Sequence, residues 1–276
     1  MNISAMIWRY ARLNVLLAVL LTAGTGPSWA GETYSFGVLN QQSPAATAAL
    51  WNPILQYLQT KTSIVFKLRM GTTVQETDAM TARGEFDFLY SNHNFDPRYA
   101  QAHYIPLAQW GGRPLVGQIV VDADSFIKTL AGLEGKTVAF PSRDAFVAYQ
   151  VIVPALKQAH VTVNQVFGAN QRGTAVLLQT GRADAASLNK QFSDQFQADN
   201  KTRFRVLYES APWPNIPVQA LPRVPKPDAE AVQKALVGMT TDPKGRALLK
   251  TLGIPGFLTV KDADYDATRR LYQEEL

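Results

Sequence analysis

Short apolar runs alternate with longer stretches of helical spacing along the first part of the chain. The clearest helical stretch is 45–60, where large apolar side chains fall on one stripe. Ser43 is placed to cap this helix, with Pro44 at its first position. The predicted elements are a strand at 34–39, the helix at 45–60, a strand at 64–69, a helix at 74–83 closed by Gly84, and a strand at 85–90. This order predicts a parallel sheet joined by right-handed crossovers.

The alternation then restarts with a second set of elements. They are strands at 115–121, 136–140, 163–167, 183–188, 203–209 and 218–221, and helical stretches at 127–130, 145–159, 172–180, 227–239, 244–252 and in the tail 262–276. Two strand–helix–strand units predict two α/β lobes facing each other across a ligand cleft. We expect residues 31–118 and 214–276 to form the first lobe and 119–213 the second. The segments near 117–121 and 210–214 are the predicted hinge.

Residues 1–30 have the pattern of a secretory signal peptide. Arg9 and Arg12 form a positive region, 15–21 is an apolar run, and Ser28-Trp29-Ala30 supplies small residues for a cleavage site. The alternative is an uncleaved membrane anchor, but the apolar run is short for a transmembrane span. We therefore expect a mature chain that begins at residue 31 and works outside the cytoplasm.

Composition narrows the possible functions. The 276 residues include no cysteine, which excludes disulfides, thiol nucleophiles and thiolate metal sites. The formal net charge is +5, and the basic residues are scattered without a run of four, which argues against a nucleic-acid partner. A modest positive balance fits an anionic ligand, but it also fits an ordinary solvated surface.

Several short motifs, taken in order, resemble the phosphate/phosphonate (PhnD-like) periplasmic substrate-binding proteins of ABC transporters. The similar segments are 36–39, 42–44, 51–58, 83–88, 124–130, 133–140, 181–185, 214–217 and 242–249. The resemblance implies a type II periplasmic binding protein fold that closes on a small oxyanion of the phosphonate, phosphite or phosphate type. It also implies a periplasmic location, a membrane permease as partner, no cofactor and no catalysis. We expect a monomer.

The loop Ser142-Arg143-Asp144-Ala145 lies between a predicted strand and a predicted helix. Backbone N–H groups and the dipole at a helix N-terminus favour an anion there, and Ser142 could cap the helix or donate its hydroxyl to the ligand. In the resembled family this loop cradles phosphonate oxygens. Arg143 could pair with the anion or point into solvent.

Other candidate ligand-binding residues follow the remaining strands. They are Gln42, Ser43, Tyr90, Ser91, Asn92, Asn170 and Asn189. Ser43 is either a ligand contact or a simple cap, and the phenol of Tyr90 could donate a hydrogen bond to the ligand. Relatives carry a histidine in the turn where this chain has Asn170, which becomes the substitute candidate. His93 could sense the protonation of a phosphate-like ligand or have no role.

The stretch after Asn189 holds no carboxylate of the kind that relatives use to read a ligand amine. This disfavours an ammonium-bearing phosphonate, because its charge would be buried without a partner.

Three other functions compete with solute binding. An enzyme is disfavoured because the three histidines adjoin no nucleophile motif. A metal-binding protein is disfavoured because no paired ligand spacing occurs. A sensory partner of a membrane signalling protein, built on the same two-lobed fold, stays open.

Overall fold

The computed structural model describes residues 33–40 and 43–273. The predicted signal peptide and Gln42 lie outside the described residues. Within the described part, no helix has the length and apolar character needed to cross a membrane.

The first lobe is built on a six-stranded sheet with the order β11-β4-β10-β3-β1-β2. Its elements are β1 (Thr33–Val38), α1 (Pro44–Thr62), β2 (Val65–Arg69), α2 (Val74–Ala82), β3 (Phe88–Tyr90), η2 (His93–Phe95), η3 (Ala100–Ala102), β4 (Ile105–Trp110), β10 (Pro217–Ala220), α6 (Lys226–Gly238), α7 (Pro243–Leu252), β11 (Phe257–Thr259), η6 (Asp262–Tyr265) and α8 (Asp266–Gln273). Strand β1 pairs in parallel with β2 and β3, as the sequence predicts. The predicted cap is also confirmed, since Ser43 accepts a hydrogen bond from Ala46 N.

Strands β4 and β11 are not predicted from the sequence. Both join the antiparallel side of the sheet, where β4 lies between β10 and β11. Pro106 within β4 argues against a central strand because proline donates no ladder hydrogen bond. The sheet accommodates it with an irregularity between Val218 and Gln219 on the partner strand.

The second lobe is built on a five-stranded sheet with the order β7-β6-β8-β5-β9. Its elements are β5 (Gly117–Asp122), η4 (Leu130–Leu133), β6 (Thr137–Phe140), a π-helix η5 (Phe146–Gln150), α3 (Ile152–Gln158), β7 (Asn164–Phe167), α4 (Gln171–Gln179), β8 (Ala185–Asn189), α5 (Lys190–Asn200) and β9 (Phe204–Glu209). Strand β6 pairs in parallel with β7 and β8, whereas β5 runs antiparallel to β8 and β9.

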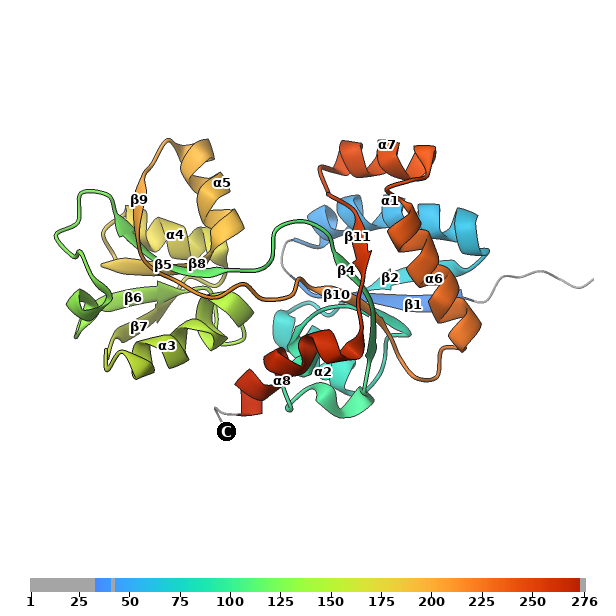
Figure 1. Cartoon of the computed structure of the whole chain (residues 1–276), viewed down its shortest axis with the longest axis horizontal. Helices are drawn as coiled ribbons and strands as arrows, with labels where there is room; N and C mark the ends of the chain where they lie inside the picture. The colour runs from blue at the N-terminus through green and yellow to red at the C-terminus, as the bar shows by residue number, and fades with distance from the viewer. Residues whose placement is uncertain (1–32, 41–42, 274–276) are drawn as a thin grey trace, which may run out of the picture. The chain divides into compact units, whose positions relative to one another are not determined.

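Two segments of the chain connect the two sheets, residues 111–116 and 210–216 (Figure 1). Leu115 and Trp213 form an antiparallel bridge between them, with N–H···O distances of 2.9 and 2.8 Å. The predicted hinge at 117–121 is therefore wrong, because β5 is paired on both sides within the second sheet. The lobe boundaries at 118/119 and 213/214 stay predictions, and the first of them falls inside β5.

The core of the first lobe is rich in aromatic side chains. Trp51 from α1 is 1% exposed, and its ring centroid lies 5.1 Å from that of Phe36 and 4.7 Å from that of Tyr90. Phe257 of β11 closes the same cluster at 6.4 Å. Packing of this density fixes how α1 lies on the sheet, and so fixes the loops at the ends of the strands.

Asp87 provides a test of stability against pH in this lobe. Burial alone would raise the pKa of Asp87, but hydrogen bonds from Ser35 N (2.8 Å) and Ser35 Oγ (2.7 Å), together with the charge of Arg223, lower it below its usual value. The ionised carboxylate therefore stabilises the fold above the unfolded pKa of about 3.9, and this contribution is lost as pH falls through the folded pKa. We expect the urea midpoint of the wild type to fall more steeply below about pH 4 than that of Asp87→Asn. Equal slopes would contradict this.

Candidate functional site

A cavity of about 170 Å³ lies where the two lobes face each other. Both lobes and both connecting segments contribute to its wall. Its lining residues are Leu39, Asn40, Val74, Asn92, His93, Leu115, Pro141, Ser142, Ala145, Phe146, Val147, Ala148, Ala169, Asn170, Gln171, Asn189 and Ile216. We call it the interlobe pocket. Among these described residues, His93 has the one ionisable side chain.

Four helical N-termini reach the interlobe pocket. Val74 begins α2, Phe146 begins the π-helix, Gln171 begins α4, and Asn189 caps α5. The first N–H groups of a helix have no partner within the helix, and the helix dipole adds partial positive charge. The pocket therefore favours a negatively charged ligand although none of its described lining residues is a lysine or arginine.

Hydrogen bonds hold the loops that carry these helix ends. Asn40 Nδ2 donates to Gly71 O at 2.9 Å, and Asn40 Oδ1 accepts from Thr77 Oγ1, which ties the end of β1 to α2. In the second lobe, Gln171 Oε1 accepts from Asn189 N at 3.0 Å, which ties the start of α4 to the cap of α5. The N-termini are thus fixed before any ligand arrives.

Two polar side chains in the pocket are without a hydrogen-bond partner among the described residues. Asn92 is 5% exposed, and its amide does not cap the short helix that follows it. The hydroxyl of Ser142 also makes no hydrogen bond, while its carbonyl accepts from Ala145 N. Asn92 is buried and Ser142 is half-buried. Polar groups shielded from water are normally paired, so these two groups are available to a ligand.

Ser142 does not cap the following helix as predicted. The helical segment begins at Phe146, and its N-cap residue is Ala145, which has no side-chain oxygen. The start is a π-helix in which Tyr149 N and Gln150 N both donate to Ala145 O. The loop is therefore longer than predicted, and Ser142 lies on it as a pocket-lining residue.

His93 is held at the pocket wall by a buried acid from α2. Its Nδ1 lies 3.0 Å from Asp78 Oδ2, and Asp78 is 1% exposed. Sequence reasoning missed Asp78. The available signal is its place between Thr77 and Met80 on the buried face of α2, since an acid on that face needs a partner.

Five of the residues predicted to bind ligand line the interlobe pocket. They are Asn92, Ser142, Ala145, Asn170 and Asn189. Asn170 and Asn189 each use the side-chain oxygen to cap a helix, accepting from Gly173 N and Gln191 N at 2.8 Å. Their amide nitrogens have no partner among the described residues.

The other described residues that were predicted to bind ligand are not among those that line the pocket. Tyr90 packs between Trp51 and Trp110, and burial raises the pKa of its phenol. Tyr90 is thus a core residue and not a donor in the cleft, because β3 turns its side chain toward α1.

Three further residues that were predicted to contact ligand have structural partners instead. Ser91 is 1% exposed and accepts from His93 N. Arg143 donates to Tyr149 Oη and lies over the ring of Phe167, and Asp144 pairs with Arg98. Ser43 is exposed and caps α1, so its role at the ligand stays a prediction.

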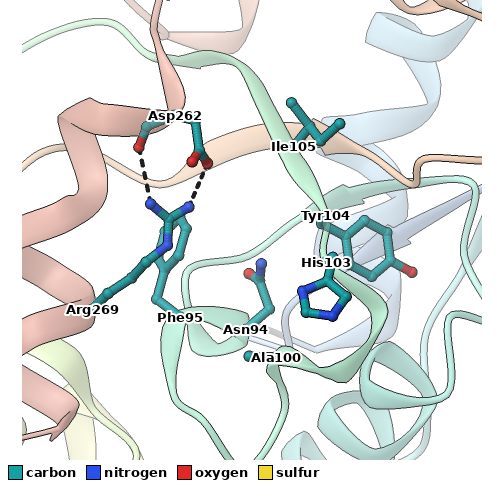
Figure 2. A pocket seen from close by; sticks show the side chains of 8 residues that line it. All are labelled: Asn94, Phe95, Ala100, His103, Tyr104, Ile105, Asp262 and Arg269. Carbon is teal, nitrogen blue, oxygen red and sulfur yellow. Dashed lines mark hydrogen bonds and ion pairs between the residues drawn. The ribbon is translucent and has the colours of Figure 1, made fainter.

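A second cavity of about 250 Å³ lies in the first lobe (Figure 2). Most of its polar side chains already have hydrogen-bond or ion-pair partners. Arg269 pairs with Asp262 across one wall, and Asn94 exchanges two hydrogen bonds with Gln219. The second lobe contributes nothing to its lining, and no four helix ends meet there. It is therefore a weaker candidate than the smaller interlobe pocket. No group of three or more metal-ligating side chains occurs among residues 33–40 and 43–273.

A sequence profile described as "ABC transporter, phosphonate, periplasmic substrate-binding protein" matches residues 36–265. The chain belongs to this family. Family membership confirms the predicted role of a solute-binding protein for an ABC importer, and such proteins are not enzymes. Comparison with curated proteins gives no significant sequence match.

Several solved structures have the same fold as this chain. The binding-protein component of an ABC phosphonate transporter from Pseudomonas aeruginosa superimposes with a TM-score of 0.72 at 14% identity, covering 87% of this chain and 85% of that one. PhnD1 from Prochlorococcus marinus, in complex with methylphosphonate, gives 0.75 at 14% identity, covering 88% and 98%. A Xanthomonas citri protein bound to ATP gives 0.71 at 17% identity, covering 88% and 95%. The predicted type II periplasmic binding fold is confirmed.

Proposed function

We propose that this phosphonate-family binding protein takes up a small oxyanion of the phosphonate, phosphite or phosphate type in the interlobe pocket. The observation that carries the proposal is the convergence of four helix N-termini on a pocket whose described lining residues include no carboxylate. Asn92 and Ser142 supply unpaired donors, and Asn170 and Asn189 supply amide nitrogens. Closure of the two lobes then surrounds the anion with donors from both sides.

The pocket wall also indicates which kind of substituent the ligand carries. Leu39, Leu115, Pro141 and Ile216 give the wall an apolar part, which suits a short alkyl group. An ammonium group would find no acidic partner among the described lining residues, so an aminoalkylphosphonate is disfavoured. A volume near 170 Å³ is below the usual range of about 300–1,000 Å³ for larger organic ligands.

We further propose that residues 1–30 are removed on export, that the mature protein is a periplasmic monomer, and that a membrane permease is its partner. N-terminal sequencing of the exported protein tests the first point and should begin at residue 31. The alternative partner is a membrane sensor protein. Deletion separates the two, because loss of uptake supports transport, whereas loss of a transcriptional response with intact uptake supports sensing.

A calorimetric and thermal-shift comparison tests the ligand class. We expect methylphosphonate, phosphite or phosphate to raise the Tm and to bind, whereas 2-aminoethylphosphonate, ATP and neutral sugars do not. Ser142→Ala should weaken binding of the preferred anion by about 1 kcal/mol, roughly fivefold, if its hydroxyl donates to the ligand. A sugar or an organic cation that binds while every anion fails would refute the proposal.

An ion pair between the lobes provides a further prediction. Arg98 of the first lobe lies 3.0 Å from Asp144 of the second and is also held by Asp96. Asp144→Asn removes this link and leaves Arg98 with Asp96. We expect ligand affinity to fall by at most about 1 kcal/mol, with a larger effect at low salt than at high salt. Asp124→Asn, on the exposed surface of the second lobe, is the control. It should change neither the ligand affinity nor the salt dependence of that affinity.

A further inference from the structure

The carboxylate of Asp78 lies in an environment where an unpaired charge is costly. It is 1% exposed, and His93 Nδ1 is its one hydrogen-bond partner among the described residues. A buried carboxylate needs a donor or an opposite charge to stay ionised. Nδ1 therefore carries a proton in this pair, which leaves Nε2 as the free nitrogen of the ring.

The free nitrogen of His93 belongs to a residue that lines the interlobe pocket. His93 is 8% exposed and lines the pocket, and Nε2 has no hydrogen-bond partner among the described residues. Nε2 is also not among the fully enclosed unpaired atoms of the described part. The ring is held from behind by Asp78, and the main-chain N of His93 donates to Ser91 Oγ at 3.1 Å.

The charged side chains near this pair are mostly acidic. The phenols of Tyr99 and Tyr272 lie within electrostatic range of one shared set of charged groups, which are Asp78, Asp96, Asp144 and Arg98. Burial is the largest cause that raises the pKa of each phenol, so both stay neutral near neutral pH. Arg98 pairs with Asp96 and Asp144, so that together with Asp78 the cluster holds three acids and one arginine. His93 is the other basic side chain of this cluster.

We propose that His93 contacts the bound anion through Nε2–H, with Asp78 as its positioning residue, so that ligand binding is coupled to uptake of a proton by the protein. The inference rests on the proposed function of the interlobe pocket. When the ring holds both protons, the His93–Asp78 pair is neutral overall and presents a charge-assisted donor to the ligand. An incoming anion stabilises that protonated form, and by linkage affinity falls as pH rises.

Calorimetric titration with methylphosphonate tests the coupling. We expect His93→Gln to bind about tenfold to a hundredfold more weakly at pH 6, as for loss of a charge-assisted hydrogen bond, and the difference to shrink at pH 8.5. Titrations in two buffers of different ionisation enthalpy should show greater proton uptake by the wild type than by His93→Gln. The titration of the ligand itself is common to both proteins and cancels in this comparison.

Two further variants separate contact from positioning. His103→Gln makes the same change at the other cavity of the first lobe and should match the wild type in affinity and proton uptake (Figure 2). Asp78→Asn still accepts from Nδ1 but lacks the charge, so we expect it to keep the fold and to lose most of the proton uptake. If His93→Gln does not fold, the imidazole resonances of the wild type serve instead, and the His93 ring should become protonated on saturation with methylphosphonate at pH 7.5.

The outcomes distinguish this inference from the proposed function. If His93→Gln binds methylphosphonate with the same affinity and proton uptake as the wild type, the inference is wrong. It is also wrong if the His93 resonance of the wild type does not change on binding. In both cases the proposed function stands. Failure of methylphosphonate, phosphite and phosphate to bind the wild type and His103→Gln at any pH from 6 to 8.5 overturns both.

Discussion

Trp51→Ala is expected to lower the free energy of unfolding by about 3–5 kcal/mol. The indole is 1% exposed and contacts the rings of Phe36 and Tyr90 and, across the sheet, Phe257. Its removal leaves a cavity between α1 and the sheet that these rigid aromatic rings fill only in part. Urea denaturation monitored by circular dichroism measures the change.

Phe126→Ala is the matched control for this aromatic truncation. Phe126 is 98% exposed, so its loss should change the free energy of unfolding by less than about 0.5 kcal/mol. A small effect of Trp51→Ala, comparable to that of Phe126→Ala, would mean that the aromatic cluster does not anchor α1.

Gly117→Ala is expected to disturb the pocket wall itself. A Cβ on Gly117 would lie 2.0 Å from Val147 O and 3.2 Å from Ile152 Cδ1. Gly117 belongs to β5, which is paired on both sides, so the π-helix start must move instead. Val147 and its neighbours line the pocket. We expect a loss of about 1–3 kcal/mol in stability, and at least a tenfold loss in anion affinity because N–H donors at this helix end are displaced.

The control for this change is Gly238→Ala in α6. A Cβ there meets nothing within 4 Å, and its backbone does not need a positive φ. Stability should stay equal or rise slightly, and anion affinity should not change. Unchanged affinity in folded Gly117→Ala would show that the π-helix N-terminus is not part of the ligand site.

Most of the fold could be predicted because its signals are local. The cap at Ser43, the terminating glycines and the apolar runs place nearly every parallel strand and its helix. Helix α5 is missed because β8 runs into it without a break, and Asn189 both ends the strand and caps the helix. The short strand β11 and the proline-containing β4 gain their strand character from tertiary pairing.

The site was harder to predict because its geometry is not local. Loop positions after strands correctly suggested Asn92, Ser142 and Asn170 as lining residues. Tyr90 was misplaced because a strand-end aromatic side chain can face either the core or the cleft, and packing against Trp51 decides between them. Asp78 was missed because a carboxylate on a short helix usually faces solvent.

The two connecting strands are joined by reciprocal backbone hydrogen bonds between Leu115 and Trp213. A ribbon made of two bonded strands bends more readily than its strands slide past each other, because sliding would break both bonds. The lobes should therefore open and close by one bending motion of this ribbon. Every ligand-free molecule should then present the same open conformation to the membrane permease.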